Sequence, residues 1–176
     1  MKKALVVVDM QNDFIDGSLG TKEAENIVNR VAKEIRKDYD LIVATRDTHG
    51  EDYLDSNEGK HLPVVHCVED SKGWQIADTV AEALKEKENL TILNKPTFGS
   101  QEVVNVLKEY DKENPIGSIT LIGLCTDICV VTNALLVKTA FPEIPVNVIK
   151  DCCAGVTPES HEAALLTMKM CQIEVL

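Results

Sequence analysis

The stretch Ser118-Ile-Thr-Leu-Ile-Gly-Leu-Cys-Thr-Asp-Ile-Cys129 joins a strand pattern to a helix pattern, and it decides the fold. Residues 118–123 are apolar and β-branched, which predicts a buried strand. Residues 127–140 carry an apolar stripe at helical spacing, which predicts a helix with Thr126 as its N-cap. Cys129 would then lie in the first helical turn, where free N–H groups and the helix dipole favour a thiolate and supply donors for an oxyanion.

The same alternation of apolar strands and amphipathic helices runs along the whole chain. Strands are predicted at 3–9, 41–46, 90–94, 118–123, 146–150 and 172–176, helices at 23–37, 76–85, 100–110, 127–140 and 157–170, and a long polar stretch at 47–73. Repeated strand–helix units with continuous apolar strands indicate a parallel sheet with helices on both faces. The sequence therefore predicts an α/β fold, with a doubly wound, mostly parallel six-stranded sheet in a single domain over residues 1–176.

Composition narrows the classes of function. Of the residues, 44% are hydrophobic and 27% are charged, and the net charge is −11 without any basic run. Binding to nucleic acid or to an anionic membrane is therefore not expected. No apolar segment approaches the roughly 20 residues of a membrane helix, and the short run after Met1 does not match a signal peptide. We expect a cytoplasmic protein with reduced cysteines, in which Cys152, Cys153 and Cys171 are small core residues.

Polar residues stand at or just after the ends of five predicted strands. They are Asp9, Asp47, Lys95, Cys129 and Asp151. A single polar residue in such a position can simply mark the end of an apolar strand. However, ligands of open α/β sheets bind outside the carboxyl ends of the strands, so several polar residues there indicate a functional site. A thiolate nucleophile, a carboxylate that takes its proton and an amine that stabilises both anions are the groups an acyl transfer needs. Cys129, Asp9 and Lys95 are the candidates for these roles.

A second set of candidate residues lies in the long polar stretch. Asp47 and His49 stand two residues apart at a strand end, and His66 follows later in the loop. One carboxylate and two imidazoles suit zinc, iron or manganese and leave positions open for water or a substrate atom. Glu58 and His61 are further candidate ligands. The alternative is that these histidines are surface residues that cap turns; a zinc site made from cysteines is less favoured because no second pair has the required spacing.

Five segments, taken in order and spacing, resemble the isochorismatase-like cysteine hydrolases, and within them the nicotinamidases. They are Val8-Asp-Met-Gln-Asn-Asp-Phe14, Thr45-Arg-Asp-Thr-His49, Pro63-Val-Val-His-Cys67, Lys95, and Gly123-Leu-Cys-Thr-Asp-Ile-Cys-Val130. The resemblance covers nearly the whole chain and implies the isochorismatase-like fold.

The resemblance also implies a catalytic site. Asp9, Lys95 and Cys129 match the family's triad, with Cys129 as the nucleophile. The backbone N–H groups of Cys125 and Cys129 match an oxyanion hole, beside a peptide bond between Leu124 and Cys125 that is cis in family members.

A metal and a substrate position follow from the same resemblance. Asp47, His49 and His66 match the ligands of a zinc or other divalent ion that holds the pyridine nitrogen in nicotinamidases, and Glu58 matches a further ligand found in some members. Phe14 matches an aromatic position near the substrate ring.

The chain departs from many nicotinamidases in the expected pocket wall. They carry a tryptophan shortly before the second histidine ligand, whereas residues 60–66 contain no aromatic side chain and Trp74 comes later. Isochorismatases proper generally lack the metal pair and split a vinyl ether. We therefore expect a metal-containing cysteine amidohydrolase that acts on a small amide, first of all nicotinamide, through a Cys129 thioester, and that forms a homo-oligomer. The alternatives are a metal-independent isochorismatase-type hydrolase and a catalytically silent domain that binds a ligand or partner.

Overall fold

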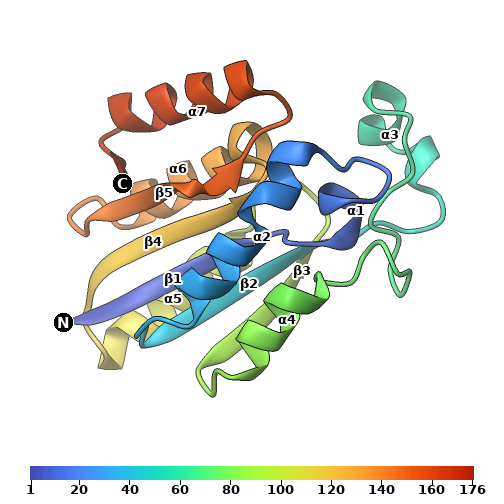
Figure 1. Cartoon of the computed structure of the whole chain (residues 1–176). Helices are drawn as coiled ribbons and strands as arrows, with labels where there is room; N and C mark the ends of the chain where they lie inside the picture. Colours follow the sequence, from blue (N-terminus) through green and yellow to red (C-terminus); the bar gives the residue numbers. More distant parts are fainter.

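The computed structural model describes all residues from Met1 to Leu176 and contains one six-stranded sheet in the order β3-β2-β1-β4-β5-β6 (Figure 1). The strands are β1 (Lys2–Val8), β2 (Leu41–Asp47), β3 (Leu90–Lys95), β4 (Ile116–Leu124), β5 (Val146–Ala154) and β6 (Glu174–Val175). Every strand pair is parallel, so the predicted fold is confirmed. The chain winds outward from β1 to one edge, then crosses back to β4. The switch in strand order lies between β1 and β4, which is where such sheets bind ligands.

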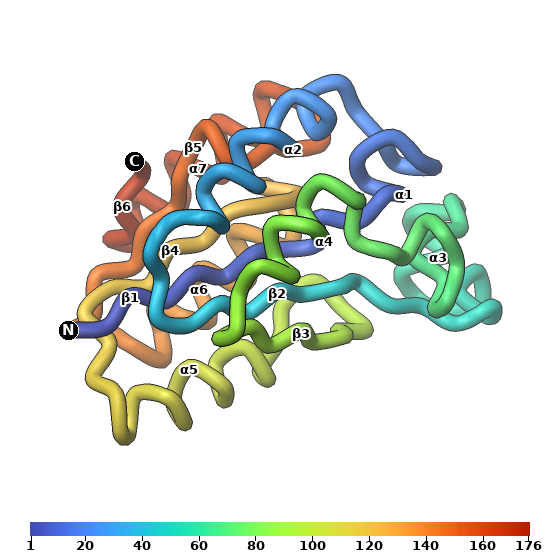
Figure 2. Tube along the Cα trace, turned by 60° about the horizontal axis from the view of Figure 1, so that its bottom comes forward, coloured from blue at the N-terminus to red at the C-terminus, as the bar shows by residue number.

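Helices cover both faces of the sheet, as predicted. α1 (Asn12–Ile15), α2 (Lys22–Ile35) and α4 (Asp78–Lys85) pack on one face, and α5 (Gln101–Glu113), α6 (Val131–Ala140) and α7 (Pro158–Met170) pack on the other. Alternate residues of β1 supply the two cores, because successive strand side chains point to opposite faces: Leu5 packs with α2 and α4, and Val6 with α5 and α6. Figure 2 shows α2 and α4 together on one side of the strands and α5 on the other.

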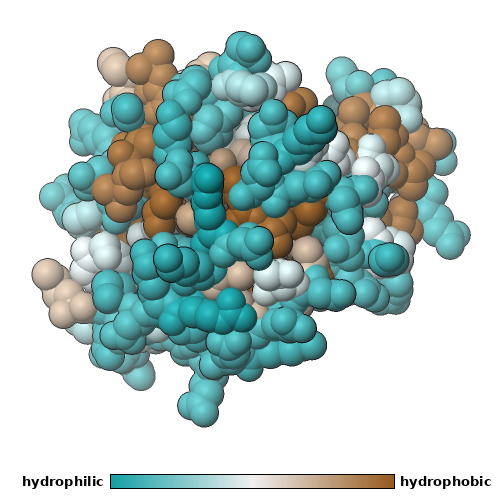
Figure 3. All heavy atoms as spheres, viewed as in Figure 1, coloured by the Kyte–Doolittle hydropathy of each residue, from teal (hydrophilic) through white to brown (hydrophobic).

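The polar stretch after β2 holds little regular structure. It contains one 3₁₀ turn, η1 (Tyr53–Asp55), and the short helix α3 (Asn57–His61), neither of which the hydrophobic pattern predicts. The face drawn in Figure 3 is mostly hydrophilic, with apolar patches in several places, one of them near this stretch. No helix of the chain combines the length and the apolar character needed to cross a membrane.

The start of the helix that carries Cys129 differs from the prediction. A single wide π-helical turn, η2 (Thr126–Val130), precedes α6, and Cys125 takes the N-cap position without a side-chain cap bond. The prediction that Thr126 is the N-cap is therefore wrong. The buried hydroxyl of Thr126 lies 2.8 Å from Nδ1 of His161 on α7, so it pairs with this distant residue rather than with the backbone N–H groups of its own helix. The predicted cap of α7 is confirmed: Thr157 accepts a hydrogen bond from Ser160, and proline follows the cap.

Two further predictions are wrong for reasons of tertiary structure. Asp151 does not follow a strand end, because β5 continues to pair Cys153 with Gly123 after a register shift, and Asp151 lies exposed within the strand. Cys171 is exposed just beyond α7, whereas Cys152 and Cys153 are buried as expected.

Candidate active site

A cavity of about 190 Å³ lies at the carboxyl ends of β2 and β4, whose last residues, Asp47 and Leu124, both line it. Its wall is mostly apolar and comes from segments far apart in the chain. It is formed by Phe14, Leu19, Thr21, Ala24, Asp47, Glu58, Leu62, His66, Phe98, Leu124, Cys125, Ile128, Cys129, Gly155 and Val156. Residues of both predicted candidate groups therefore face one enclosed space.

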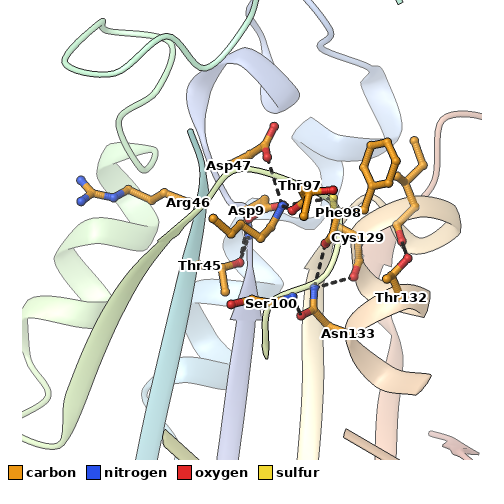
Figure 4. Close-up of polar contacts among 12 residues, drawn as sticks. Asp9, Thr45, Arg46, Asp47, Thr97, Phe98, Ser100, Cys129, Thr132 and Asn133 are labelled. Atoms are coloured by element: carbon orange, nitrogen blue, oxygen red, sulfur yellow. Dashed lines mark hydrogen bonds and ion pairs between the residues drawn. The ribbon is translucent and has the colours of Figure 1, made fainter. Parts of the chain in front are cut away.

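The three predicted triad residues meet beside this cavity, and Figure 4 shows two of them, Asp9 and Cys129. Lys95 Nζ lies 2.7 Å from Asp9 Oδ2 and 3.4 Å from Cys129 Sγ. All three residues are buried, since Asp9 is 0% exposed, Lys95 1% and Cys129 6%. The sheet brings them together because β1, β3 and β4 are parallel and end at the same edge.

Asp9 is held in place by a neighbouring strand. The Thr45 hydroxyl on β2 donates to Asp9 Oδ1 at 2.7 Å and accepts from the Asp9 backbone N–H at 3.2 Å. Burial raises the pKa of Asp9, and the Lys95 ammonium offsets only part of that rise. A carboxylate with a raised pKa is a stronger base than an exposed one, which suits it to take a proton from a thiol.

Lys95 remains protonated in this setting. Burial alone lowers the pKa of Lys95, but the negative charges of Asp9 and its neighbours outweigh this effect and raise the net value. Its ammonium also donates to Asp47 Oδ1 at 3.2 Å and to the Thr97 carbonyl oxygen at 3.0 Å. Lys95 is therefore a fixed positive charge between two carboxylates and a sulfur atom.

Cys129 differs from the prediction in its protonation. Burial raises the pKa of its thiol well above the ordinary value, the charge of Asp9 raises it further, and Lys95 opposes the rise only in part. The placement near a helix start predicted a thiolate, but desolvation in a nearly closed site is the larger effect. The resting group is the thiol, and a base must remove its proton before the sulfur can attack.

The turn before Cys129 leaves a backbone donor free. The peptide bond between Leu124 and Cys125 is cis, as expected, and the Cys125 N–H makes no hydrogen bond within the protein. Gly123 has a φ of 121°, and a Cβ there would lie 2.1 Å from the Val8 carbonyl oxygen, so only glycine fits. Cys125 and Cys129 both line the cavity, which places the turn against any bound substrate.

The predicted metal ligands converge at the other end of the cavity. Asp47, His49, Glu58 and His66 each offer one ligand atom, and these atoms lie within 4.8 Å of one another. Nε2 of His49 lies 2.9 Å from Asp47 Oδ2, and Nε2 of His66 lies 3.5 Å from the same oxygen. Two imidazoles and two carboxylates at this spacing fit a divalent ion such as zinc, iron or manganese.

The surroundings orient these ligands. His66 Nδ1 lies 2.8 Å from the Val64 carbonyl oxygen, which can only accept, so Nδ1 carries a proton and Nε2 faces the cluster. The Tyr53 ring packs 4.6 Å from the His49 ring and 4.9 Å from the His66 ring, measured between centroids. Burial by itself raises the pKa of Asp47, but hydrogen bonds to both histidines lower it more, so the carboxylate stays ionised.

The cavity wall carries two phenylalanine side chains, Phe14 and Phe98. Phe14 was predicted near the substrate ring, whereas Phe98 was not singled out. Trp74 is not part of the wall: its indole N–H donates to Thr48 at 2.8 Å, and its ring stacks on Arg46 at 3.7 Å. His61, a candidate ligand, stays outside the cluster, with Nδ1 2.8 Å from the Asn57 carbonyl oxygen.

Two supporting residues were missed by the sequence reasoning. Thr45 could have been found, since it stands two residues before Asp47 on the same strand and so points to the same face. Gln11 carries no such signal, yet its buried amide donates to the carbonyl oxygens of Asp47 at 2.8 Å and Trp74 at 2.9 Å and accepts from the Asp47 N–H at 2.7 Å. Gln11 thereby fixes the end of β2 against the loop that follows.

Comparison with known proteins agrees with this geometry. The isochorismatase domain model matches residues 3–176. The nicotinamidase/pyrazinamidase of Mycobacterium tuberculosis is 27% identical over 184 residues, covering 99% of this chain and 98% of that protein.

Solved structures give the same result. The pyrazinamidase of Pyrococcus horikoshii in complex with zinc is 29% identical, with a TM-score of 0.82 over 100% of this chain and 99% of that one. The nicotinamidase/pyrazinamidase of Bacillus subtilis is 25% identical, with a TM-score of 0.84 over 99% of both chains. The family resemblance inferred from the motifs is confirmed, and the chain belongs to the isochorismatase domain family.

Proposed function

We propose that this hydrolase is a metal-containing cysteine amidohydrolase, with nicotinamide as its first candidate substrate and nicotinate and ammonia as products. One observation carries the proposal: a single cavity is lined by Cys129 at one place and by Asp47, Glu58 and His66 at another. A small aromatic amide with a ring nitrogen has one group for each place: its amide carbon for the Cys129 sulfur, and its ring nitrogen for the metal-binding residues. The nicotinamidase and pyrazinamidase activities named for its relatives support the same class of substrate.

The metal would be held by Asp47, His49, Glu58 and His66, whose donor atoms already converge. Zinc is the first choice because the donors are imidazole and carboxylate and because the related Pyrococcus horikoshii structure contains zinc. When bound, the ion supplies a Lewis-acid contact for the ring nitrogen of the substrate. Phe14 and Phe98 would pack against the ring.

In the first half of the reaction, Asp9 takes the proton of the Cys129 thiol, and the sulfur attacks the amide carbon. The N–H groups of Cys125 and Cys129 would hold the oxygen of the tetrahedral intermediate. Asp9 then gives its proton to the amide nitrogen, the carbon–nitrogen bond breaks, and ammonia leaves. Cys129 is left as a thioester of the acid.

In the second half, a water molecule attacks the thioester carbon and Asp9 takes one of its protons. The carbon–sulfur bond breaks, the acid is released, and the proton returns to the sulfur. Lys95 stays charged throughout, because it lies between Asp9 and Cys129 and stabilises whichever of them is anionic. Amide and water are consumed, and acid and ammonia are formed.

The proposal is tested by ammonia release from nicotinamide and from a panel of small aromatic and aliphatic amides. We expect activity in the wild type, none in Cys129→Ala, and wild-type activity in Cys171→Ser, which removes an exposed cysteine instead. Mass spectrometry of a rapidly quenched reaction should find the acyl group on Cys129. A wild type that is inactive on the whole panel would exclude amide hydrolysis.

The metal is tested separately by elemental analysis of the native protein. We expect about one divalent ion per chain and its loss in His49→Ala. A native protein that hydrolyses its substrate without bound metal would instead support the metal-independent isochorismatase-type alternative.

A further inference from the structure

Asn133 is a fully buried polar residue inside the apolar helix α6, and no step of the proposed reaction uses it. Asparagine is less favourable than alanine in a helix interior, and a buried amide must be hydrogen-bonded. Its Nδ2 donates to the Cys129 carbonyl oxygen at 2.8 Å and to the Phe98 carbonyl oxygen at 3.1 Å, and its Oδ1 accepts from the Ser100 N–H at 3.0 Å (Figure 4). One side chain thus joins the nucleophile turn to the loop that follows β3.

That loop, residues 96–100, presents two groups to the site. Its Thr97 carbonyl oxygen accepts from the Lys95 ammonium at 3.0 Å, and Phe98 lines the cavity although it is 43% exposed. Close packing supports the same arrangement, because a Cβ at Gly99 would lie 2.7 Å from side-chain atoms of Thr132 and Leu136 on α6. The position of the loop relative to Cys129 is therefore set by α6.

We propose that Asn133 is a positioning residue, which holds the 96–100 loop and the Cys129 turn in the relative placement that amide hydrolysis needs. The proposal rests on the proposed function for its kinetic effect. The Cys129 contact alone is an ordinary helical one, from residue 133 back to residue 129. The two contacts to the loop, which no local helical role explains, are the ones that fix Lys95 and Phe98 against the sulfur.

A threonine at this position separates the two kinds of contact. In this protein, helical threonines donate to the carbonyl four residues earlier: Thr132 to Ile128 at 2.6 Å, Thr139 to Leu135 at 2.8 Å and Thr167 to Ala163 at 3.0 Å. Asn133→Thr therefore keeps the bond to the Cys129 carbonyl but is too short to bond the loop. The matched control is Thr132→Val, which loses one helical bond in the same turn without touching the polar groups of the loop.

We expect Asn133→Thr to lower kcat/KM for nicotinamide by about 10- to 100-fold, through kcat as well as KM, because small displacements of reacting groups have effects of this size. The kcat/KM of Thr132→Val should stay within about twofold of the wild-type value, and its Tm should be comparable to that of the wild type. Amide hydrogen exchange at Ser100 should be faster in Asn133→Thr and unchanged in Thr132→Val. Asn133→Ala, which also loses the helical bond, should be no more active than Asn133→Thr.

Wild-type kcat and KM in Asn133→Thr would overturn the proposal, as would equal losses in Asn133→Thr and Thr132→Val. Failure of the proposed function looks different, because the wild type itself would then release no ammonia. In that case exchange at Ser100 still decides whether Asn133 holds the loop, since this measurement needs no substrate: unchanged exchange in Asn133→Thr overturns the positioning role.

Discussion

The two ends of the cavity are built in different ways. Asp9 and Lys95 stand at strand ends, and Cys129 lies in the π-helical turn that follows β4, so the sheet sets their separations. At the other end only Asp47 stands on a strand. The remaining ligands come from the irregular stretch between β2 and α4. The group with the nucleophile is thus fixed by backbone pairing, whereas the metal-binding group depends on side-chain contacts.

Those contacts can be identified. Asp13 Oδ2 accepts from the Cys67 N–H at 2.8 Å and so holds the residue next to His66. Gln11 holds the Asp47 backbone through two hydrogen bonds. Asp47 itself connects the two ends, with Oδ1 on Lys95 and Oδ2 toward the histidines. Substitutions near the nucleophile should therefore disturb both ends of the cavity, because Lys95 also contacts Asp47, whereas substitutions in the loop should disturb only metal binding.

The largest expected effect is that of Lys95→Met. It removes the ammonium between Asp9 and Asp47 and leaves the buried Asp9 carboxylate without a counter-charge, which should lower the free energy of unfolding by about 3–5 kcal/mol and abolish ammonia release. Urea unfolding and the activity assay measure the two effects. As a control, the double variant Asp9→Asn/Lys95→Met should regain stability without regaining activity. Wild-type stability in Lys95→Met would contradict the central role given to this charge.

Metal removal should affect one end alone. Treatment with a strong chelator should lower kcat/KM by about 100-fold, since a Lewis-acid contact contributes several kcal/mol. The rate at which iodoacetamide labels Cys129 should stay unchanged, because the sheet holds the triad without the metal. Restored activity on adding zinc is the control. A large change in labelling rate would show that the two ends are not independent.

Gly73→Ala should weaken metal binding by a smaller amount. A Cβ at Gly73 would lie 2.0 Å from Asp13 Oδ2, so Asp13 must move and release the Cys67 N–H beside His66. We expect about tenfold weaker metal binding, as for other groups that orient ligands, measured by competition with a chromophoric chelator. Gly117→Ala is the matched control, because its Cβ would meet the Met1 side chain and the Lys2 carbonyl oxygen and no residue that holds a metal ligand. Equal metal affinity in the two variants would argue against a role for Asp13.

The smallest expected effect is on the rate at which iodoacetamide labels Cys129, and it leaves the fold intact. Because burial raises the pKa of the Cys129 thiol in the folded protein, its thiolate fraction at pH 7–8 is lower than in the unfolded chain, and it grows as the pH rises toward the folded pKa. Iodoacetamide should therefore label native Cys129 more slowly than the urea-unfolded protein at pH 7–8, and faster as the pH increases. Peptide mapping in a Cys171→Ser background measures this. Faster labelling of the native site at pH 7 would show an activated thiolate instead.

Much of the site follows from local patterns in the sequence. Apolar runs predict the parallel strands, and a polar residue after each strand is expected at the edge where ligands bind. Asp9, Lys95 and Cys129 were found in this way, and Asp47, His49, Glu58 and His66 by residue type and by family resemblance. The catalytic roles, the single domain over residues 1–176, self-association and a cytoplasmic location stay predictions.

Other features depend on partners far away in the chain. The Thr126 hydroxyl pairs with His161 rather than with its own helix, and Asn133 joins a helix to a loop more than thirty residues earlier. Hydrophobic periodicity carries no information about such contacts, because it reports which face is buried and not which polar groups meet there.

The sequence by itself determined the fold class, the order of the elements and the residue types at the edge of the sheet, because these follow from backbone periodicity and from where strands end. Only the tertiary structure decided the protonation of Cys129, the exclusion of Trp74 from the cavity and the contacts that hold the loops. The physical reason is that desolvation and hydrogen bonding depend on what surrounds a group in space, and those neighbours come from every part of the chain.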